Sequence, residues 1–250
     1  MAGSDEGAVS FGAVAGVYEA GRPEYPAEAV QWMLEPVSGG AGRRVRVADV
    51  GAGTGKLTRV VSAVGGDVVA VDPDAYMLAA LRDAVRDVPT FIGTAESLPF
   101  QDAEFDAVVL GQAWHWVDPV TGSREIGRVL RDGGVLGLIW NLRDDSDAWA
   151  RRLDAIMPEG KAQEMLAAGT PPVRAPFGES EERVWHWTRQ LTRSEVGDMV
   201  RSRSFYITAT PEQCAGIDGA LDELLDDLGL DSDETIDLPY VTRAYRVVRR

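Results

Sequence analysis

The stretch Val47-Ala-Asp-Val-Gly-Ala-Gly-Thr-Gly-Lys-Leu-Thr58 decides the fold of this chain. Its apolar start predicts a buried strand, and its last residues predict the beginning of a helix. The three alternating glycines between them remove side chains where a backbone must turn sharply and let a ligand come close. The stretch therefore predicts a ligand-binding loop between a strand and a helix.

Two common nucleotide-binding motifs do not fit this loop. A dinucleotide fingerprint needs glycine where Lys56 stands, and a Walker loop needs glycine at Val50 and Ser or Thr at Leu57. The pattern that remains is D-x-G-x-G-x-G after an apolar strand. It resembles the nucleoside-binding loop of the class I S-adenosylmethionine (SAM) dependent methyltransferases.

The second predicted strand supplies the partner that such a loop needs. Asp67-Val-Val-Ala-Val-Asp72 places four apolar residues before a carboxylate, as in a strand buried on both faces. A carboxylate roughly 20 residues after the loop accepts hydrogen bonds from ribose hydroxyls. We expect Asp72 to bind the ribose, because the alternative, a helix-capping role, fits Asp74 better.

Three further segments are similar to the same family, so that the resemblance covers residues 11–141 well and the last hundred more loosely. They resemble the loop whose Met lies against adenine, the loop that reads the adenine edge, and the helix, turn and fifth strand: Asp72–Leu78, Gly93–Phe100 and Arg128–Leu136. The family's Pro-Gly-Gly is Asp132-Gly-Gly here, which changes only a turn. The cofactor-binding residues that the resemblance implies are Asp49, Gly51, Ala52, Gly53, Thr54, Gly55, Asp72, Pro73, Met77, Thr94, Ala95, Glu96, Gln112, Ala113 and Trp114.

The amino-terminal residues 11–26 resemble the family's F-x-x-x-A-x-x-Y-x-x-x-R-P-x-Y-P opening. The resemblance implies that residues 1–37 form a segment that covers the cofactor. Arg22 would pair with the methionyl carboxylate, and Tyr18 would border the methyl group. The alternatives are a surface ion pair for Arg22 and packing on the sheet for Tyr18.

The end of the predicted fourth strand, Gly111-Gln-Ala-Trp-His-Trp116, is expected beside the donor methyl group. Trp114 offers a flat wall to a sulfonium cation or a planar acceptor, whereas Trp116 is expected to pack in the core. His115 is the candidate catalytic residue, because an imidazole accepts a proton near neutral pH. The alternative is a transfer that needs only the apposition of nucleophile and methyl group.

Alternating strands and helices predict a doubly wound, mostly parallel, seven-stranded α/β sheet with helices on both faces, in one domain over residues 1–250. Apolar runs predict strands at Val45–Val50, Val68–Val71, Thr90–Ile92, Phe105–Leu110, Val135–Trp140, Val184–Thr188 and Val241–Val248. Residues 143–182 interrupt the alternation and are expected to form a lid over the acceptor after the fifth strand. The alternative is a helical hairpin that only shields the sheet edge.

The composition of the chain limits the partners that it is expected to bind. The net charge of −15 opposes binding to nucleic acid. The chain has no apolar run long enough to span a membrane and no signal peptide, so a cytoplasmic location is expected. One cysteine and two distant histidines give no metal-ligand spacing. The sequence does not indicate an oligomeric state.

These observations favour a SAM-dependent methyltransferase that acts on a small molecule by in-line displacement and releases S-adenosylhomocysteine. The resemblance is greatest to the group that includes trans-aconitate and ubiquinone or menaquinone methyltransferases. Three alternatives remain: a non-catalytic SAM-binding regulatory or scaffold protein, aminopropyl transfer on the same fold, and a nicotinamide-dependent oxidoreductase, which Lys56 disfavours.

Overall fold

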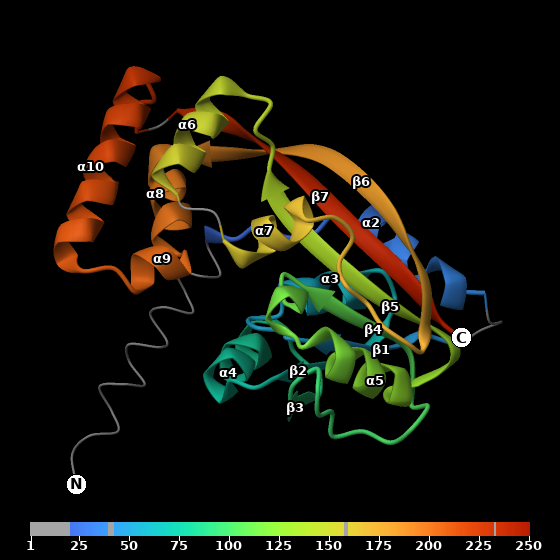
Figure 1. Cartoon of the computed structure of the whole chain (residues 1–250). Coiled ribbons are helices and arrows are strands. Elements are labelled where there is room, and N and C mark those ends of the chain that lie inside the picture. Colours follow the sequence, from blue (N-terminus) through green and yellow to red (C-terminus); the bar gives the residue numbers. More distant parts are fainter. Residues whose placement is uncertain (1–20, 40–42, 158–159, 233) are drawn as a thin grey trace, which may run out of the picture. The chain divides into compact units, whose positions relative to one another are not determined.

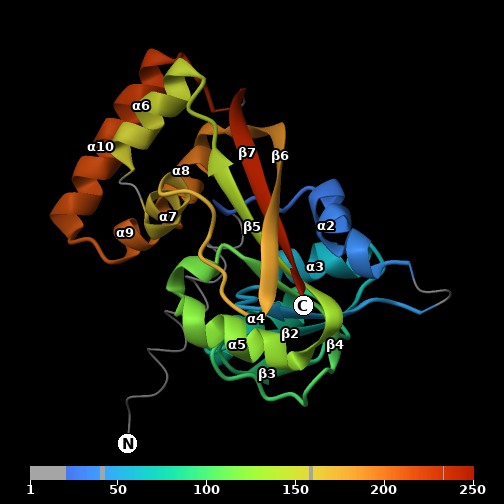
Figure 2. The same ribbon diagram turned by 45° about the vertical axis from the view of Figure 1, so that its right-hand side comes forward.

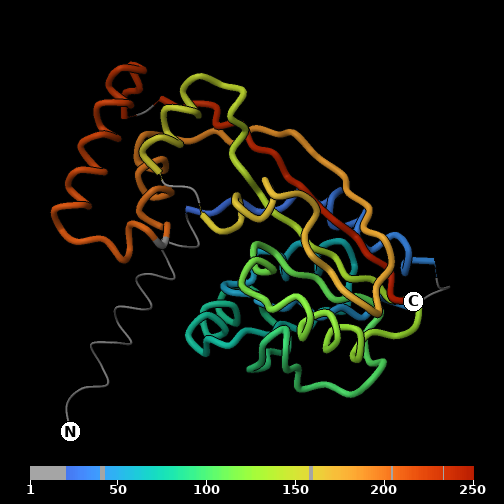
Figure 3. The backbone as a smooth tube through the Cα atoms, viewed as in Figure 1, coloured from blue at the N-terminus to red at the C-terminus, as the bar shows by residue number. Residues whose placement is uncertain are grey.

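The computed structural model describes residues 21–39, 43–157, 160–232 and 234–250, and the chain divides into two compact units. Unit 1 consists of Met1–Pro23, Leu142–Gly160 and His186–Val241. Unit 2 consists of Glu24–Asn141, Lys161–Trp185 and Thr242–Arg250. The division falls within three strands, so that each of them contributes residues to both units (Figure 3).

The strands form one seven-stranded sheet in the order β3-β2-β1-β4-β5-β7-β6 (Figure 1). Its first four neighbouring pairs are parallel, whereas the sheet as a whole is mixed. The prediction of a mostly parallel α/β sheet is therefore confirmed. The strands are β1 (Arg46–Val50), β2 (Asp67–Asp72), β3 (Thr90–Ile92), β4 (Phe105–Gly111), β5 (Leu130–Arg143), β6 (Phe177–Thr192) and β7 (Thr235–Arg249).

The order of these strands positions the ligand site. β1 lies between β2 and β4, although β2 and β3 separate it from β4 in the sequence. The chain therefore leaves β1 toward one side of the sheet and returns on the other. In open α/β sheets, ligands bind outside the carboxyl ends of the strands at such a switch point. Here these ends are Val50, Asp72 and Gly111.

Helices cover both faces of the sheet in unit 2. Val68 and Ala70 lie on the same face of β2, and both belong to apolar clusters that α2, α3 and α4 complete. Figure 2 shows α5 on the opposite side of these strands from α2 and α3. The helices are α2 (Ala27–Leu34), α3 (Lys56–Ala63), α4 (Ala75–Ala84), α5 (Pro119–Val129) and α7 (Lys161–Ala167), with short 3-10 turns η1 (Glu35–Val37) and η2 (Trp114–Trp116).

Two aspartates begin the helices that flank the site. The Asp74 carboxylate accepts a hydrogen bond from the backbone N–H of Tyr76 at 2.8 Å and caps α4. Asp118 does the same for Thr121 at the start of α5, where Pro119 occupies the first turn. The expected capping role of Asp74 is thus confirmed, which leaves Asp72 for other contacts.

At the amino-terminal edge of the sheet, Asp106 of β4 holds three segments together. Its carboxylate accepts hydrogen bonds from the Arg43 guanidinium at 2.6 and 2.8 Å, from the Arg46 N–H at 2.8 Å and from Arg131 at 2.5 Å. Burial opposes ionisation of this group, but these donors outweigh it and lower the Asp106 pKa to about 2.

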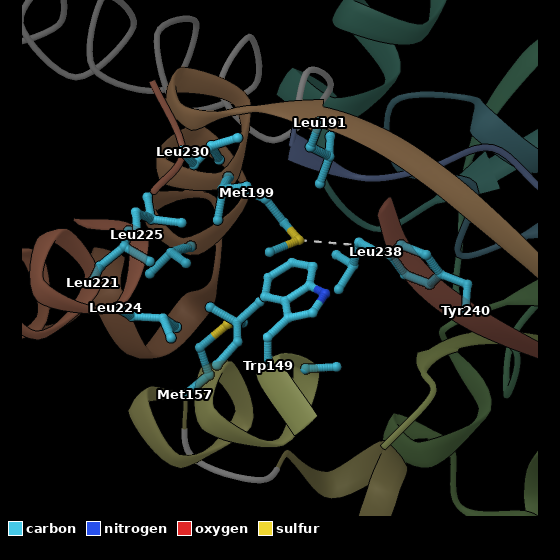
Figure 4. Packing of buried hydrophobic residues seen from close by; sticks show 14 residues of the cluster. Trp149, Met157, Leu191, Met199, Leu221, Leu224, Leu225, Leu230, Leu238 and Tyr240 are labelled. Carbon is cyan, nitrogen blue, oxygen red and sulfur yellow. Dashed lines mark hydrogen bonds between the residues drawn. The ribbon is translucent and has the colours of Figure 1, made fainter. Parts of the chain in front are cut away.

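Unit 1 has an apolar core of its own (Figure 4). Its helices are α6 (Ala148–Ile156), α8 (Arg193–Arg201), α9 (Ser204–Ile207) and α10 (Pro211–Asp227). Leu221, Leu224 and Leu225 point from α10 into this core, beside Trp149 and Met199. The acidic segment that begins at Pro211 therefore forms the ordinary amphipathic helix that its leucine spacing predicts.

The region between β5 and β6 differs from the predicted lid over residues 143–182. β5 extends to Arg143 and β6 already begins at Phe177. The intervening helices belong to different units, since α6 lies in unit 1 and α7 in unit 2. The lid is therefore not confirmed as one insertion. None of the helices in the described part of the chain is long and apolar enough to cross a membrane.

Candidate active site

The glycine loop joins β1 to α3 with left-handed backbone at all three glycines, where φ is 70° at Gly51, 54° at Gly53 and 91° at Gly55. The N–H groups of Gly51 and Ala52 donate to the Val71 carbonyl at 2.8 and 3.0 Å, which fixes the loop to the end of β2. A Cβ at Gly51 would lie 2.7 Å from Cβ of Ala113. The loop therefore touches the chain that follows β4 as well.

Gly53 differs from the other two glycines. A Cβ at Gly55 would lie 2.8 Å from Leu81, so this glycine permits close packing of α4. A Cβ at Gly53 would meet no described atom within 4 Å. The backbone at Gly53 thus borders open space, and its left-handed φ suits glycine for conformational reasons.

Asp72 lies directly beside this open position. Its Oδ2 accepts a hydrogen bond from the Gly53 N–H at 2.9 Å, and its Oδ1 accepts one from the Asp74 N–H at 2.9 Å. Only 8% of the residue is exposed. Burial raises the Asp72 pKa, and the two backbone donors partly offset this effect. The geometry leaves each carboxylate oxygen with a further lone pair for a ligand hydroxyl.

Asp49, one strand away, is fully buried. Its Oδ2 accepts a hydrogen bond from Thr58 Oγ1 at 2.6 Å, whereas its Oδ1 has no hydrogen-bond partner among the described residues. Burial raises the Asp49 pKa to about 7, and the nearby Asp72 charge adds to the rise. Such a group gains from a proton or from a ligand that donates a hydrogen bond.

The chain after β4 is held by Asn141 of β5. Gln112 has a positive φ of 56° and donates from its N–H to the Ile139 carbonyl and from Nε2 to the Asn141 carbonyl, at 2.9 and 2.7 Å. The Asn141 side chain donates to the Glu24 carbonyl at 3.0 Å and accepts from Thr242 at 2.6 Å. Asn141 therefore joins the end of β4, through its backbone carbonyl, to the segment before α2 and to β7, through its side-chain amide.

Tyr25 completes this corner. A Cβ at Gly111 would lie 2.7 Å from the Tyr25 hydroxyl and 3.2 Å from Leu57. Only glycine at the end of β4 therefore accommodates the tyrosine ring in this position.

The two tryptophans after β4 differ from expectation in their exposure, because Trp114 is buried and Trp116 is exposed. Trp114 is 1% exposed, and its Nε1 has no hydrogen-bond partner in the described part of the chain. Trp116 is 66% exposed, and the Lys161 ammonium of α7 lies 4.3 Å from the centre of its ring. The expectation that Trp116 packs in the core was wrong, because the 3-10 turn directs this second indole outward. Trp116 rather than Trp114 offers the accessible flat wall.

His115 lies between these tryptophans and accepts a hydrogen bond at Nδ1 from Nε1 of Trp140, at 3.4 Å. An indole N–H only donates, so the neutral imidazole in this contact carries its proton on Nε2. It then offers a donor rather than a base. The catalytic role of His115 stays a prediction, and this geometry favours the alternative in which the residue shapes the wall.

The loop after β3 is compact. The backbone groups of Thr94 and Ser97 exchange hydrogen bonds at 3.1 Å, and Ala95 between them is buried. The Glu96 carboxylate accepts from the N–H of Asp118 at 3.0 Å. This part of the loop is therefore tied to the start of α5.

Unit 2 brings together sixteen of the eighteen predicted site residues, namely Asp49, Gly51, Ala52, Gly53, Thr54, Gly55, Asp72, Pro73, Met77, Thr94, Ala95, Glu96, Gln112, Ala113, Trp114 and His115. Arg22 belongs to unit 1, and its role toward a ligand carboxylate stays a prediction. Tyr18 lies outside the described residues.

Sequence reasoning missed Thr58, Tyr25 and Asn141. Thr58 could have been found, because a hydroxyl in the first turn of a helix that follows a buried aspartate reaches back to it. Tyr25 carried a signal in the R-P-x-Y-P pattern. Asn141 gave none, because its partners are up to 117 residues away in the sequence.

The polar groups of the site fit a nucleoside with a cationic side chain. The open backbone at Gly53 and the adjacent Asp72 carboxylate suit a ribose, and the buried Asp49 oxygen suits a hydrogen-bond donor or a cation. Within the described ranges, no group of three or more His, Cys, Asp or Glu side chains is arranged to hold a metal ion.

Comparison with known proteins finds methyltransferases. A family model described as a methyltransferase domain matches residues 48–138, from within β1 to within β5. An uncharacterized methyltransferase of Mycobacterium tuberculosis is 41% identical over 245 residues, which cover 95% of this chain and 95% of the relative.

Two further similarities are more limited. A demethylmenaquinone methyltransferase of a Mycobacterium species is 44% identical over 107 residues, or 42% of this chain and 46% of the relative. The crystal structure of the YcgJ protein from Bacillus subtilis superimposes with a TM-score of 0.52 at 22% identity, covering 90% of this chain and 99% of that one. The latter shows the fold alone.

Proposed function

The chain belongs to this methyltransferase family and is a SAM-dependent methyltransferase, and on that basis we propose that it methylates a small-molecule acceptor by in-line displacement. The donor, when bound, supplies an electrophilic methyl group on a sulfonium cation. The acceptor's nucleophilic atom would use its own electron pair to bond to the methyl carbon. The carbon–sulfur bond would break at the same time, and the electron pair of that bond would remain on sulfur. S-Adenosylhomocysteine is then the product.

The single observation that carries the donor assignment is the position of Asp72. Its carboxylate lies 2.9 Å from the N–H of Gly53, the one glycine of the loop that borders open space. A ribose placed there can donate from both hydroxyls to the carboxylate. Asp72 would thereby orient the donor, while the buried Asp49 oxygen would accept a hydrogen bond from the ammonium group of its methionyl part.

The remaining predicted residues have supporting roles in this proposal. Pro73 and Met77 flank Asp72 and would border the adenine, and Thr94, Ala95 and Glu96 would read its edge. Alignment of nucleophile and methyl group within the site supplies a large share of the rate enhancement in such reactions. No general base is needed for an acceptor that is already a good nucleophile.

A small acceptor is supported by charge and by the exposed aromatic wall. The net charge of −15 disfavours a phosphate backbone as a partner. Trp116 offers a flat apolar face to a planar molecule, on the element that directly follows β4. The name of the demethylmenaquinone methyltransferase relative is consistent with a planar acceptor of this kind.

Replacing Asp72 with alanine tests the donor site. Loss of charge-assisted hydrogen bonds to the ribose should weaken binding of both SAM and S-adenosylhomocysteine by about 1.5–3 kcal/mol. Isothermal titration calorimetry measures both affinities. Asp74→Ala is the matched control, because it removes a neighbouring carboxylate that caps α4 and should lower the melting temperature without a comparable loss of affinity.

Equal affinities of the wild type and Asp72→Ala would contradict the ribose assignment. Absence of SAM binding by the wild type would contradict the proposed function itself.

A further inference from the structure

The Arg128 guanidinium, near the end of α5, contacts the last residues of the adenine-edge loop (Gly93–Phe100) and Asp102 just after it. Its Nη2 donates to the Leu98 carbonyl at 3.2 Å, and its Nη1 donates to the Phe100 carbonyl at 2.9 Å and to the Asp102 carboxylate at 2.8 Å. Three alternate residues of the chain between β3 and β4 thus converge on one side chain. Neither backbone carbonyl belongs to a helix or a strand.

Glu125, one turn earlier on α5, makes the opposite contact with the same segment. Its Oε1 accepts a hydrogen bond from the Leu98 N–H at 2.9 Å. The same carboxylate receives both Nε and Nη2 of Arg128, at 2.9 and 2.7 Å. The pair therefore holds Leu98 through its N–H and its carbonyl at once, and the bidentate ion pair fixes the geometry of both side chains.

The start of α5 holds the middle of the loop, through the hydrogen bond from the Asp118 N–H to Glu96. The helix itself is anchored, because Ile126 and Val129 are fully buried and the chain continues directly into β5. Glu96 and Leu98 of the loop are thus both attached to one helix. Their position relative to the sheet, and hence to Asp72 on β2, follows from that attachment.

We propose that Arg128 and Glu125 are positioning residues that set the adenine-edge loop and thereby the selectivity of the enzyme for an adenine base. The inference rests on the proposed SAM-binding function. Neither side chain needs to touch the ligand, because both act through the backbone of Leu98 and Phe100. A loop that reads donors and acceptors on a base edge must be held to within a fraction of an ångström.

The guanidinium is specifically required for this task. It presents five N–H donors in a planar fork and uses them here on two carboxylates and two carbonyls. A lysine at this position would keep the charge but would offer one mobile point charge instead of a fork. Arg128→Lys should therefore keep the protein folded while loosening the loop.

The test compares binding of S-adenosylhomocysteine with binding of S-inosylhomocysteine by calorimetry. The inosine base exchanges donor for acceptor on the edge that the loop is expected to read. We expect the wild type to prefer the adenosyl ligand, and Arg128→Lys, Arg128→Gln and Glu125→Gln to reduce that preference by about tenfold or more, as expected for one lost hydrogen-bonding pair. Hydrogen exchange at residues 94–98 should increase in the same variants.

Arg246→Gln is the matched control. Arg246 is a comparably buried guanidinium that joins Glu35, Glu181 and the Trp32 carbonyl, all outside the adenine-edge loop. It should lower stability and leave the preference for adenine unchanged.

Two results would overturn the inference while leaving SAM binding intact. One is an unchanged preference in all three variants, and the other is a wild type that binds both ligands equally. A wild type that binds neither ligand would instead overturn the proposed function.

Discussion

At the scale of single residues, the proposed site contains two buried carboxylates in different environments. Asp72 receives two backbone N–H donors, whereas Asp49 receives one hydroxyl and keeps an oxygen without a partner among the described residues. A buried carboxylate with an unused oxygen is costly when ionised. Asp49 therefore carries a proton over part of the physiological pH range in the ligand-free protein.

This protonation predicts a characteristic pH dependence of stability. The folded-state pKa of Asp49, about 7, lies above its unfolded value near 3.8. The folded protein holds a proton that the unfolded chain releases, so the contribution of Asp49 to stability falls as pH rises from about 4 to 7 and is constant above that. Asp49→Asn should therefore gain stability relative to the wild type between pH 5 and pH 8, as measured by urea unfolding.

Asp106→Asn provides a control, because the pKa of Asp106 is shifted in the opposite direction to that of Asp49. The Asp106 pKa is lowered to about 2, so its stabilising contribution is present above pH 4 and is lost only as pH falls toward 2. This variant should be destabilised by the same amount at pH 5 and pH 8. A constant difference between the wild type and Asp49→Asn across that range would show that Asp49 is already ionised at pH 5.

His115 gives the second prediction at this scale. Because its Nδ1 already accepts from Trp140, we expect His115→Ala to leave S-adenosylhomocysteine affinity nearly intact and to slow transfer only modestly at every pH. General-base catalysis would instead cost about 10²–10⁴-fold, with partial recovery at high pH where the acceptor ionises by itself. Single-turnover rates against pH distinguish the two, once a screen with labelled donor has identified an acceptor. His115→Gln, which keeps an N–H donor, should remain close to the wild-type rate.

At the scale of elements, the sequence predicted the glycine loop and the first four strands, with the ends of each strand correct to within one residue. Those elements have short-range signals, because each apolar run ends at Gly, Asp or Pro. β5 was predicted as Val135–Trp140 but begins at Leu130, with a shift of register where Ala107 pairs with Val135. The Asp132-Gly-Gly turn lies inside this irregular strand. The lengths of β6 and β7 were likewise set by distant partners rather than by local pattern.

The sequence predicted part of the candidate site in the same way, from local motifs. The residues on the glycine loop and at the strand ends follow from motif and spacing, whereas Asn141 and the Arg128–Glu125 pair act on segments far away in the sequence. The exposure of Trp116 was also out of reach, because an alternating aromatic pair does not reveal which ring a 3-10 turn directs outward. Contacts across the fold decide these features.

α6 and α7 together replace the predicted lid, and hydrogen exchange can test whether either responds to a ligand. α7 is held by Lys161 on Trp116 and by Arg243, which donates to the Leu166 carbonyl. Trp116 is exposed and Arg243 is partly exposed, so α7 should gain protection when S-adenosylhomocysteine binds. α6 buries Trp149 and Leu153 and should exchange equally in both states. Equal protection of α7 with and without ligand would exclude a lid role for that helix.

At the scale of the whole molecule, two apolar cores are joined by shared strands. Leu224 belongs to the core of unit 1 and Val61 to the core of unit 2. Both units include discontinuous segments of chain, and β5, β6 and β7 supply residues to each. Removal of any of these strands would therefore remove residues from both units.

Truncations in the two cores test this coupling. Leu224→Ala should cost about 2–5 kcal/mol, and Val61→Ala should cost somewhat less because it removes fewer atoms. In differential scanning calorimetry, each variant should lower the midpoint of one common transition. Two separate transitions, with each variant shifting only one of them, would show that the units unfold independently.

The line that divides the units crosses β5 between Asn141 and Leu142, β6 between Trp185 and His186, and β7 between Val241 and Thr242. These three positions are suitable crossover points for recombination between homologous genes. A gene chimera that takes residues 142–160 and 186–241 from a homologue would exchange unit 1 beyond residue 23 while leaving the glycine loop, Asp72 and the Arg128–Glu125 pair untouched. Such chimeras would pair the proposed donor-binding unit with different versions of the other unit.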